Sequence, residues 1–465
     1  MQVTTPYTGE VIATVPVGSS ADVDAAVAAA KAAFPSWSSL TVKTRADYMT
    51  RFTAALLAHE DELSDLVVRE HGKTKSEALA SVRKGAETAD YASGLPHLWP
   101  GSVMEVSRGV RCEDRREPLG VVASIVPFNF PVMVPMWTAP MAITSGNTLV
   151  IKPSEKVPLT LNRIAEIAKD IFPPGVFNLV HGDRTTAQAI IQHPDVRAIT
   201  FVGTSVVAQA VARQARALDK RVLALGGAKN HLIAAPDCDV AMTSTDVVAS
   251  FSGCAGERCM AASVLLLVGE QQELVDAIVS KAKALTPGSG QGQMGPVIDA
   301  ASRDRIHGYI QEAEEGGAKV LLDGRGSWGP PGSQGFWVGP TILLHSNPKD
   351  RALHEEIFGP VLSILTCSSA SEALAIEAGN PYGNAACIYT TSGAVADHFT
   401  RHLQAGMIGV NIGVPVPREP FSFGGIHASS FGDHDITGDG GLAFFTQRKK
   451  VTTKWTVPTE ASWMS

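Results

Sequence analysis

The residues most able to do chemistry lie in the segment Phe251–Cys259, which reads FSGCAGERC. Cys259 follows Arg258 directly, and a cysteine acts as a nucleophile only as a thiolate, which a neighbouring cation favours. Gly256 indicates a backbone that another group can approach closely. A free cysteine is usually a buried packing residue. The glycine and the arginine together favour a reactive nucleophile at Cys259.

Polar residues that suit a bound ligand follow two short apolar runs. The run at 121–126 leads into a turn that proline brackets on both sides, and Asn129 lies on this turn. Its amide could donate to an oxyanion that develops during a reaction. The run at 148–151 leads into Lys152 and Glu155, a cation and a carboxylate suited to ribose hydroxyls. Each feature alone is more often structural, since turn asparagines and strand-end lysines are common.

A third apolar run, at 198–202, leads into Gly203 and Thr204, which open a helix-length stretch. The N-terminus of such a helix could hold a pyrophosphate, although a lone Gly-Thr is usually only a helix cap. The sequence contains no G-x-G-x-x-G, so an ordinary Rossmann fingerprint is absent.

Parallel sheets would bring these residues together, and two series of short apolar runs predict such sheets. The first series lies at 121–126, 148–151, 176–180, 198–202 and 222–225, and the second at 264–268, 319–322, 361–365, 385–389 and 409–411. Runs that are apolar on both faces and are separated by helix-length stretches indicate parallel strands with helices on both sides. We therefore predict an α/β fold with two doubly wound domains, whose ligands bind at the carboxyl ends of strands.

Helices and a hairpin are expected outside these series. Ser19–Asp22 reads as a capping box at the start of a helix, and further helical patterns cover 45–70 and 74–91. Charged, alternating residues at 106–117 favour an exposed hairpin. The polar, strand-like tail at 444–455 has no obvious local partner, so it is either an oligomer contact or a frayed terminus.

Composition narrows the class of protein. The 465 residues exceed one ordinary core, and 45% hydrophobic with 18% charged residues is typical of a globular protein. A net charge of −7 argues against nucleic acid or an anionic membrane as a partner, and no apolar run approaches the roughly 18 residues of a membrane span. Six scattered cysteines and no recognisable leader predict a reducing compartment, either the cytoplasm or, for a processed eukaryotic chain, the mitochondrial matrix. The 13 histidines lack metal-ligand spacing, so no metal site is predicted.

Taken in order, the motifs resemble those of the aldehyde dehydrogenase superfamily over essentially the whole chain. The matching segments are Pro127–Pro131, Lys152–Glu155, Phe201–Thr204, Gly256–Cys259, Glu356–Pro360 and Phe423–Gly425. Within the superfamily, Gly227–His231, Glu257–Met260 and the Val-Pro-Val-Pro that ends at Pro417 resemble the CoA-acylating methylmalonate-semialdehyde dehydrogenases. That branch converts methylmalonate or malonate semialdehyde to propionyl-CoA or acetyl-CoA with loss of CO₂.

The resemblance implies roles for individual residues. Cys259 would be the nucleophile, and Asn129 with the Cys259 N–H would form the oxyanion hole. The cofactor, NAD rather than NADP, would be bound by Phe128, Lys152, Glu155, Gly203, Thr204, Glu356 and Phe358. Arg258 and Arg116, with Arg115 as the alternative to Arg116, would bind the substrate carboxylate, since arginine matches a carboxylate bidentately.

The resemblance also bears on the fate of the thioester. Hydrolytic members carry a general-base glutamate at the position of Ala224 or Leu225, depending on the alignment, and this chain has no carboxylate there. A thiolate can attack a thioester without a base, whereas water cannot do so efficiently, so coenzyme A is the expected acceptor. The alternatives are an enzyme that releases a free acid with a displaced base, such as Glu257, and a non-enzymatic relative.

Family architecture implies the domain boundaries and the assembly. An NAD-binding domain is expected at 1–103 and 123–226, a catalytic domain at 227–437, and a small β oligomerisation lobe at 104–122 and 438–465. The lobe would join a homotetramer that is a dimer of dimers. Residues 418–420 differ from the sequence that is commoner in this branch, and we expect them to line the mouth of the substrate site.

Overall fold

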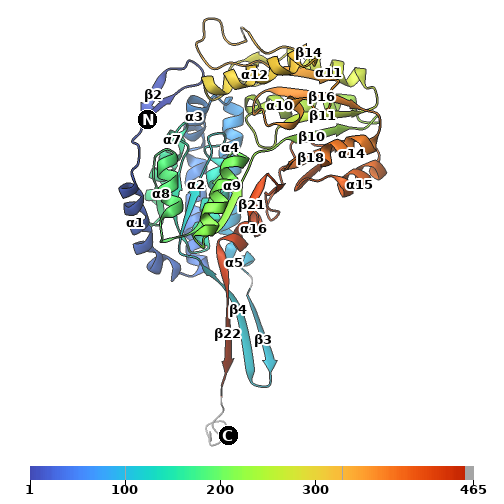
Figure 1. The fold of residues 1–465 in the computed structure, drawn as a ribbon. Coiled ribbons are helices and arrows are strands. Elements are labelled where there is room, and N and C mark those ends of the chain that lie inside the picture. The colour runs from blue at the N-terminus through green and yellow to red at the C-terminus, as the bar shows by residue number, and fades with distance from the viewer. Residues whose placement is uncertain (100, 327, 456–465) are drawn as a thin grey trace, which may run out of the picture.

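The computed structural model describes residues 1–99, 101–326 and 328–455. Two α/β units form the body, and a narrow three-stranded lobe extends away from it (Figure 1). The body therefore has the two sheets expected from the two series of apolar runs. No helix in the described ranges is long and apolar enough to cross a membrane.

The first sheet has the strand order β21-β9-β8-β5-β6-β7. Its strands are β5 (Val121–Ile125), β6 (Thr148–Lys152), β7 (Phe177–Leu179), β8 (Val196–Val202), β9 (Arg221–Leu225) and β21 (Ser430–Gly432). All pairs are parallel except β21 with β9. The chain runs outward from β5 through β6 to β7, then returns to β8 on the other side of β5. This reversal opens a crevice at the carboxyl ends of β5 and β8, where ligands of such sheets bind.

Helices cover both faces of the first sheet because its strands alternate their side chains between two apolar clusters. Val121, Ala123 and Ile125 of β5 pack with α1, α8 and α9, whereas Val122 packs with the cluster that includes α2, α3, α4, α6 and α7. The helices of this unit are α1 (Ser20–Ser38), α2 (Val42–Ala58), α3 (Glu60–His71), α4 (Lys75–Ser93), α5 (Leu95–Leu98), α6 (Met133–Thr144), α7 (Pro158–Lys169), α8 (Arg184–Gln192) and α9 (Ser205–Ala217). The capping box at Ser19 is present.

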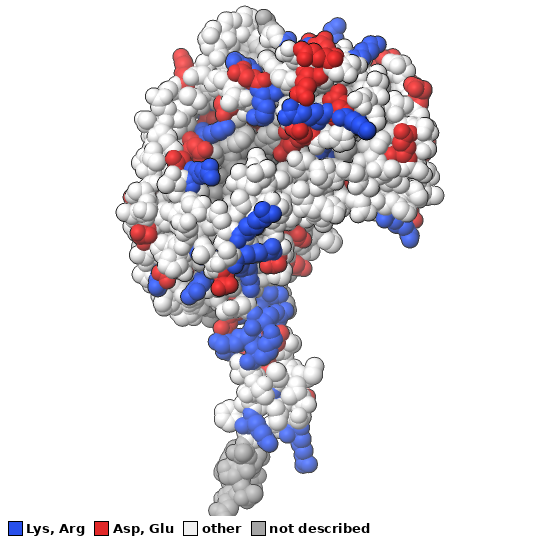
Figure 2. All heavy atoms as spheres, viewed as in Figure 1, with Lys and Arg blue, Asp and Glu red and all other residues white. Residues whose placement is uncertain are grey.

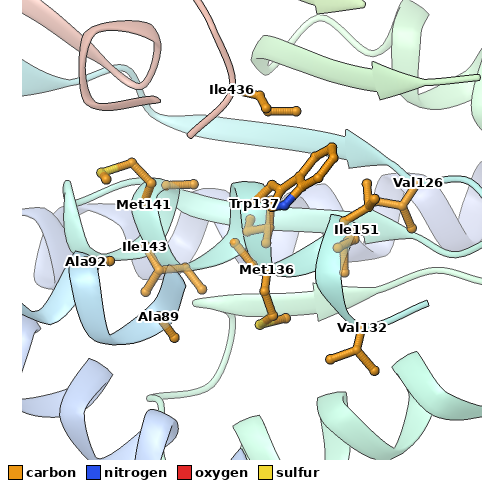
Figure 3. Packing of buried hydrophobic residues seen from close by; sticks show 14 of the residues in the cluster. Ala89, Ala92, Val126, Val132, Met136, Trp137, Met141, Ile143, Ile151 and Ile436 are labelled. Atoms are coloured by element: carbon orange, nitrogen blue, oxygen red, sulfur yellow. The ribbon is translucent and has the colours of Figure 1, made fainter. Parts of the chain in front are cut away.

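Helix α6 lies at the centre of the larger cluster and is buried along nearly its whole length. Figure 3 shows Trp137 of this helix among Val126, Ile151 and Ile436. The Trp137 ring also contacts Phe423, with ring centroids 4.4 Å apart. The core of the first unit therefore reaches residues far along the chain, beyond the second sheet.

The second sheet has the order β14-β15-β16-β11-β10-β18-β19, parallel except for β14 at its edge. Its strands are β10 (Asn230–Ala234), β11 (Ala262–Val268), β14 (Lys319–Leu322), β15 (Thr341–His345), β16 (Val361–Cys367), β18 (Ala385–Tyr389) and β19 (Met407–Val410). Its helices are α10 (Val240–Ser252), α11 (Gln272–Lys283), α12 (Ala300–Glu315), α13 (Arg351–His354), α14 (Ala370–Ala378) and α15 (Gly393–His402). Helices α10 and α11 pack on one face, and α14 and α15 pack on the other.

Three two-stranded sheets complete the body. They pair β1 (Gln2–Thr4) with β2 (Val11–Thr14), β12 (Thr286–Pro287) with β13 (Gln293–Met294), and β17 (Tyr382–Gly383) with β20 (Ile426–His427).

The lobe consists of β3 (Ser102–Ser107), β4 (Val110–Pro118) and β22 (Thr446–Lys454), all antiparallel. The hairpin predicted at 106–117 is present, and the tail strand has a partner within the chain, because β22 pairs with β4 along its whole length. Figure 2 shows basic side chains gathered on the lobe. Residues 456–465 of the predicted lobe lie outside the described residues.

The structure corrects the expected boundary between the catalytic domain and the lobe. Strand β21 joins the first sheet, and residues 438–444 form α16 (Gly438–Phe444), which packs on α6. Ile436, Leu442 and Phe444 belong to the core of the first unit. The chain therefore returns to the first unit before residue 437, and its second lobe segment begins at Thr446.

Candidate active site

A cavity of about 470 Å³ opens at the strand reversal of the first sheet, and we call it the switch-point cavity. One wall comes from the turns that follow four parallel strands of the first sheet, β5, β6, β8 and β9. The other comes from the second unit: Cys259, helix α12 and the segment that follows α13. The lining residues are Pro127, Phe128, Asn129, Ser154, Glu155, Lys156, Val202, Gly203, Thr204, Gly226, Gly227, Cys259, Ser302, Arg305, Glu356 and Phe358. Eight of the predicted site residues, drawn from segments far apart in the sequence, meet in it.

A second, smaller cavity of about 220 Å³ has mostly apolar walls, and we call it the apolar cavity. Its lining residues are Glu77, Ala80, Ser81, Phe130, Met133, Trp137, Cys254, Arg258, Cys259, Met260, Val414, Val416 and Phe423. Cys259 lines both cavities. A thiol between a polar cavity and an apolar one can meet two different ligands, one from each side.

The turn that carries Cys259 is built tightly. Cys254 and Ala255 have φ values of 52° and 51°, in the left-handed region that costs energy for residues with a side chain. A Cβ on Gly256, which has φ +73°, would lie 2.1 Å from the Gly359 oxygen, so only glycine fits there. This glycine was expected to let another group approach the backbone closely, and the closeness of Gly359 confirms it.

Two asparagine side chains hold the backbone of the cysteine itself. The carbonyl of Cys259 accepts hydrogen bonds from Asn230 Nδ2 and from Asn384 Nδ2, both at 2.8 Å. Asn230 begins β10, and Asn384 directly precedes β18, so the central strands of the second sheet fix the position of the thiol.

Two opposing effects set the protonation state of Cys259. Burial raises the pKa of its thiol to about 12, the Glu356 carboxylate adds to this effect, and Arg258 lowers the pKa only in part. Arg258 favours the thiolate, as expected, but desolvation of the thiolate outweighs the attraction of the guanidinium, so the pKa stays above its ordinary value. Cys259 must lose a proton before it can attack.

Asn129 lies on the turn after β5, as predicted, and reaches the nucleophile segment. Its Nδ2 donates to the backbone carbonyl of Glu257 at 3.0 Å, and the residue is buried. The amide is therefore held two residues from Cys259, beside the same cavity.

Arg258 lines the apolar cavity together with a carboxylate that sequence analysis did not consider. Arg258 Nη2 lies 3.5 Å from Glu77 Oε1. The same oxygen accepts the Cys254 N–H at 2.7 Å, and the other oxygen accepts the Thr74 N–H at 3.0 Å. Burial opposes ionisation of Glu77, but Arg258, Lys73 and the two N–H groups hold its pKa below the ordinary value. Glu77 is therefore an ionised carboxylate.

Burial opposes the charge of Arg258, but Cys254 and Glu77, both close to the guanidinium, raise the pKa of Arg258 above its ordinary value. Cys254 is buried, and it lines the apolar cavity beside Arg258. The turn folds back on itself, and this proximity is not visible from sequence spacing.

The predicted cofactor residues lie together, with one exception. Phe128, Glu155, Gly203, Thr204, Glu356 and Phe358 line the switch-point cavity. Lys152 lies behind its wall: the ammonium is almost fully buried, donates to the Pro153 carbonyl at 2.9 Å and lies 3.7 Å from Glu155. Burial lowers the pKa of Lys152.

The switch-point cavity has the form of a dinucleotide site. Helix α9 begins at its edge, and its N-cap Thr204 makes no side-chain cap, so N–H groups of the first turn remain available for an anion. A Cβ on Gly227 would lie 2.3 Å from Glu356 Oε2, so the glycine leaves the room that this carboxylate occupies. Burial raises the pKa of Glu356 to about 7, and one of its oxygens accepts the Ala228 N–H at 2.9 Å.

The structure does not bring Arg116 to the nucleophile, which corrects the expectation for this residue. Arg116 lies on β4 of the lobe, and its Nη1 donates to Thr446 Oγ1 at 3.0 Å. It lines a different cavity, together with Arg115 and Trp99. The strand register of the lobe explains this placement, since β4 is committed to β22 and β3.

The position of the hydrolytic general base is apolar. Ala224 and Leu225 end β9 and are buried. Glu257, the alternative base, is fully buried, its Oε1 accepts the Ile298 N–H at 3.2 Å, and it lines neither cavity. Burial raises the pKa of Glu257 to about 8. The acids that line the two cavities are Glu77, Glu155 and Glu356.

Comparisons with known proteins agree with this geometry. Residues 1–451 match the model of the aldehyde dehydrogenase family. The chain is 42% identical over 456 residues to malonate-semialdehyde dehydrogenase 1 of Geobacillus thermodenitrificans, a match that covers 97% of this chain and 94% of the relative.

Two solved structures extend the comparison. The methylmalonate-semialdehyde dehydrogenase of Oceanimonas doudoroffii superposes with a TM-score of 0.97 at 39% identity, over 98% of this chain and 95% of the other. A Sinorhizobium meliloti relative solved in complex with NAD has a TM-score of 0.97 at 37% identity, over 99% and 95% of the two chains. The fold, the motifs and the full-length matches show that this chain belongs to the aldehyde dehydrogenase family.

Proposed function

We propose that this protein oxidises malonate or methylmalonate semialdehyde with NAD⁺ and transfers the acyl group to coenzyme A with loss of CO₂. The main support is the position of Cys259 between the two cavities, together with the apolar residues Ala224 and Leu225 where a hydrolytic relative carries its base. The names of the relatives favour the same substrates.

The apolar cavity is the proposed binding site for the aldehyde. Its walls of Phe130, Met133, Trp137 and Met260 suit a short carbon chain, and its volume of about 220 Å³ excludes a bulky one. Arg258 also lines this cavity and contributes a guanidinium group. The contact with Glu77 at 3.5 Å is long, so donors of Arg258 remain for a substrate carboxylate.

The first chemical step is attack of the Cys259 sulfur on the aldehyde carbon. Because burial keeps the thiol protonated, a base must accept its proton, and Glu356 lines the same cavity with a pKa near neutrality. The carbonyl oxygen becomes an alkoxide, which Asn129 Nδ2 and the Cys259 N–H are proposed to stabilise. The asparagine contacts to the Cys259 carbonyl keep this backbone in place.

The switch-point cavity fits NAD⁺, which when bound supplies the acceptor for the hydride that leaves the former aldehyde carbon. Glu356 would hold one ribose, and Glu155 with Lys152 behind it would hold the other. The N–H groups at the start of α9 would hold the pyrophosphate. Glu155 disfavours an added 2′-phosphate by repulsion, which supports NAD over NADP.

The acyl group then remains on Cys259 as a thioester. A carboxylate β to the thioester carbonyl can leave as CO₂, with its bonding electrons passing to the α-carbon, which then takes up a proton. The remaining acyl group is transferred when a thiolate attacks the carbonyl and Cys259 leaves as thiolate. Such a nucleophile needs no base at Ala224 or Leu225, whereas water does.

The test measures NADH formation from malonate semialdehyde with and without coenzyme A, with Cys259→Ala as the inactive control. We expect steady turnover only with coenzyme A, with acetyl-CoA and CO₂ as products. Steady turnover without coenzyme A, with a free acid as product, would overturn the acylating assignment. It would then point to Glu77 or Glu356 as the base, since both line a cavity with Cys259.

We also propose that the lobe joins copies of the chain in a homotetramer. Val103, Met104 and Val106 of β3 are exposed apolar residues on a projecting strand, which is typical of a surface that a second copy covers. Light scattering of the purified protein and of a Val103→Glu/Met104→Glu variant tests this assembly.

A further inference from the structure

The loop 411–423 forms one wall of the apolar cavity. It contributes Val414, Val416 and Phe423, while helix α4 contributes Glu77, Ala80 and Ser81. The space available to a ligand therefore depends on how closely this loop lies against α4.

The loop is well anchored at its two ends. The Gly413 carbonyl accepts a hydrogen bond from Ser250 Oγ at 2.7 Å. The Phe423 N–H donates to Thr437 Oγ1 at 2.8 Å, and the Phe423 carbonyl accepts the Ile436 N–H at 3.0 Å. In the described chain, the hydrogen bonds from residues 414–419 to other segments are those of the Glu419 side chain.

Glu419 is bound to helix α4. Its Oε2 lies 2.8 Å from Lys84 Nζ, and Thr88 Oγ1 donates to its Oε1 at 3.5 Å. The Lys84 and Glu419 side chains are only 18% and 10% exposed. Removal of Lys84 leaves the buried Glu419 charge without compensation, which is costly. Lys84 also lies 3.4 Å from the more exposed Glu87 Oε2, so removal of Glu419 leaves it with this weaker partner.

Lys84 lies on the same face of α4 as the cavity residues. It follows Glu77 by seven residues and Ser81 by three, which are helical spacings that place side chains on one side. Lys84 and Glu419 themselves do not line the cavity. The pair thus lies next to the wall and can act on bound substrate only through the loop.

We propose that the Lys84–Glu419 ion pair fixes loop 411–423 against α4 and so determines which aldehydes the apolar cavity accepts. Both are positioning residues. The inference rests on the proposed function only in taking this cavity as the aldehyde site, and it requires neither coenzyme A nor a substrate carboxylate.

The test compares Lys84→Met, Glu419→Gln and the charge reversal Lys84→Glu/Glu419→Lys with the wild type. Uncharged aldehydes from propanal to octanal are the substrates, and malonate semialdehyde is the carboxylated comparison. We expect each single variant to raise KM for propanal about tenfold and to shift the preference toward longer chains, with kcat within about threefold. The charge reversal should bring KM back to within about threefold of the wild type. The matched control is Asp65→Asn. This change on α3 breaks an exposed ion pair to Lys75, which lies on α4 as Lys84 does.

Trypsin gives a second readout that does not need activity. Arg418 is exposed and precedes Glu419, so cleavage after Arg418 reports release of the loop. We expect faster cleavage in both single variants and a wild-type rate in the charge reversal.

Wild-type KM and cleavage rates in the single variants would overturn the proposal, as would a charge reversal that behaves like the sum of the single changes. A KM change confined to carboxylated aldehydes would also overturn it, since Lys84 would then act on the substrate itself. Failure of the acylating assignment would appear separately, as turnover of the wild type without coenzyme A.

Discussion

Gly253→Ala is a direct test of Arg258, because it displaces the guanidinium without changing its chemistry. A Cβ built on Gly253 would lie 1.5 Å from Arg258 Nη2 and 2.3 Å from its Cζ. The glycine has φ −59°, which alanine adopts without strain. The methyl group therefore takes the place of the guanidinium, and the arginine must turn away from Glu77 and the cavity.

The expected rise in KM follows from the hydrogen bonds between Arg258 and the substrate carboxylate that the variant loses. A hydrogen bond to a charged group contributes about 1.5–3 kcal/mol, so KM for malonate semialdehyde should rise about 10- to 150-fold. Propanal carries no carboxylate and makes no such bond, so its KM should change less than about threefold. The ratio of the two KM values is therefore the quantity to measure.

The assay is NADH formation with each substrate for the wild type, Gly253→Ala and Gly308→Ala. Gly308 lies on α12, and a Cβ there meets nothing within 4 Å, so its replacement is the matched control. An equal rise of KM for both substrates would show that the methyl group disturbs the nucleophile turn in general. An unchanged KM for malonate semialdehyde would refute Arg258 as its carboxylate ligand.

Three further predictions follow from other contacts. Gly227→Ala should raise KM for NAD⁺ about tenfold without affecting KM for aldehyde, because the new methyl group displaces the Glu356 carboxylate; unchanged cofactor kinetics would contradict this. Alkylation of Cys259 by iodoacetamide in the free protein should accelerate about tenfold per pH unit from pH 7 to 10, since its raised pKa keeps the thiolate scarce; a plateau below pH 8 would contradict the raised pKa. Glu70→Ala should lower the free energy of unfolding by about 1–3 kcal/mol in urea titrations, because two N–H groups in the first turn of α7 lose their acceptor, whereas the exposed Glu273→Ala should change it by less than about 0.5 kcal/mol.

The sheets and the strand-end residues could be predicted because both follow from local patterns. Runs that are apolar on both faces identify parallel strands, and parallel strands bring their carboxyl ends to one edge. Asn129, Gly203 and Thr204 meet in one cavity for this reason. Strands β10 and β15 were both missed. Asn230 and His231 give the start of β10 a polar character.

The contacts that could not be predicted join distant segments. Glu77 completes a capping box with Thr74, so the local pattern already accounts for it. Its bond to Cys254 spans 177 residues and leaves no trace in spacing. The prediction that Arg116 binds the substrate carboxylate had the opposite weakness. An arginine suits a carboxylate, but the pairing of β4 with β22 holds this one in the lobe.

The protonation state of Cys259 was also beyond sequence reasoning. The adjacent arginine is visible in the sequence, whereas the desolvation of the thiol depends on how the surrounding segments close over it. In the folded chain the second effect is the larger.

The position of Cys259 in the lining of two cavities has a kinetic consequence. Since the sulfur borders one cavity on each side, a molecule can enter or leave one of them while the other stays filled. Neither reactant would then need to pass the other, and we expect inhibition by one product to be competitive only with the reactant that shares its side. If the acyl acceptor arrives through the switch-point cavity, the reduced dinucleotide has to leave first. If it arrives through the apolar cavity, the dinucleotide can stay bound. Product-inhibition patterns would therefore identify the route by which the acceptor reaches the acyl group.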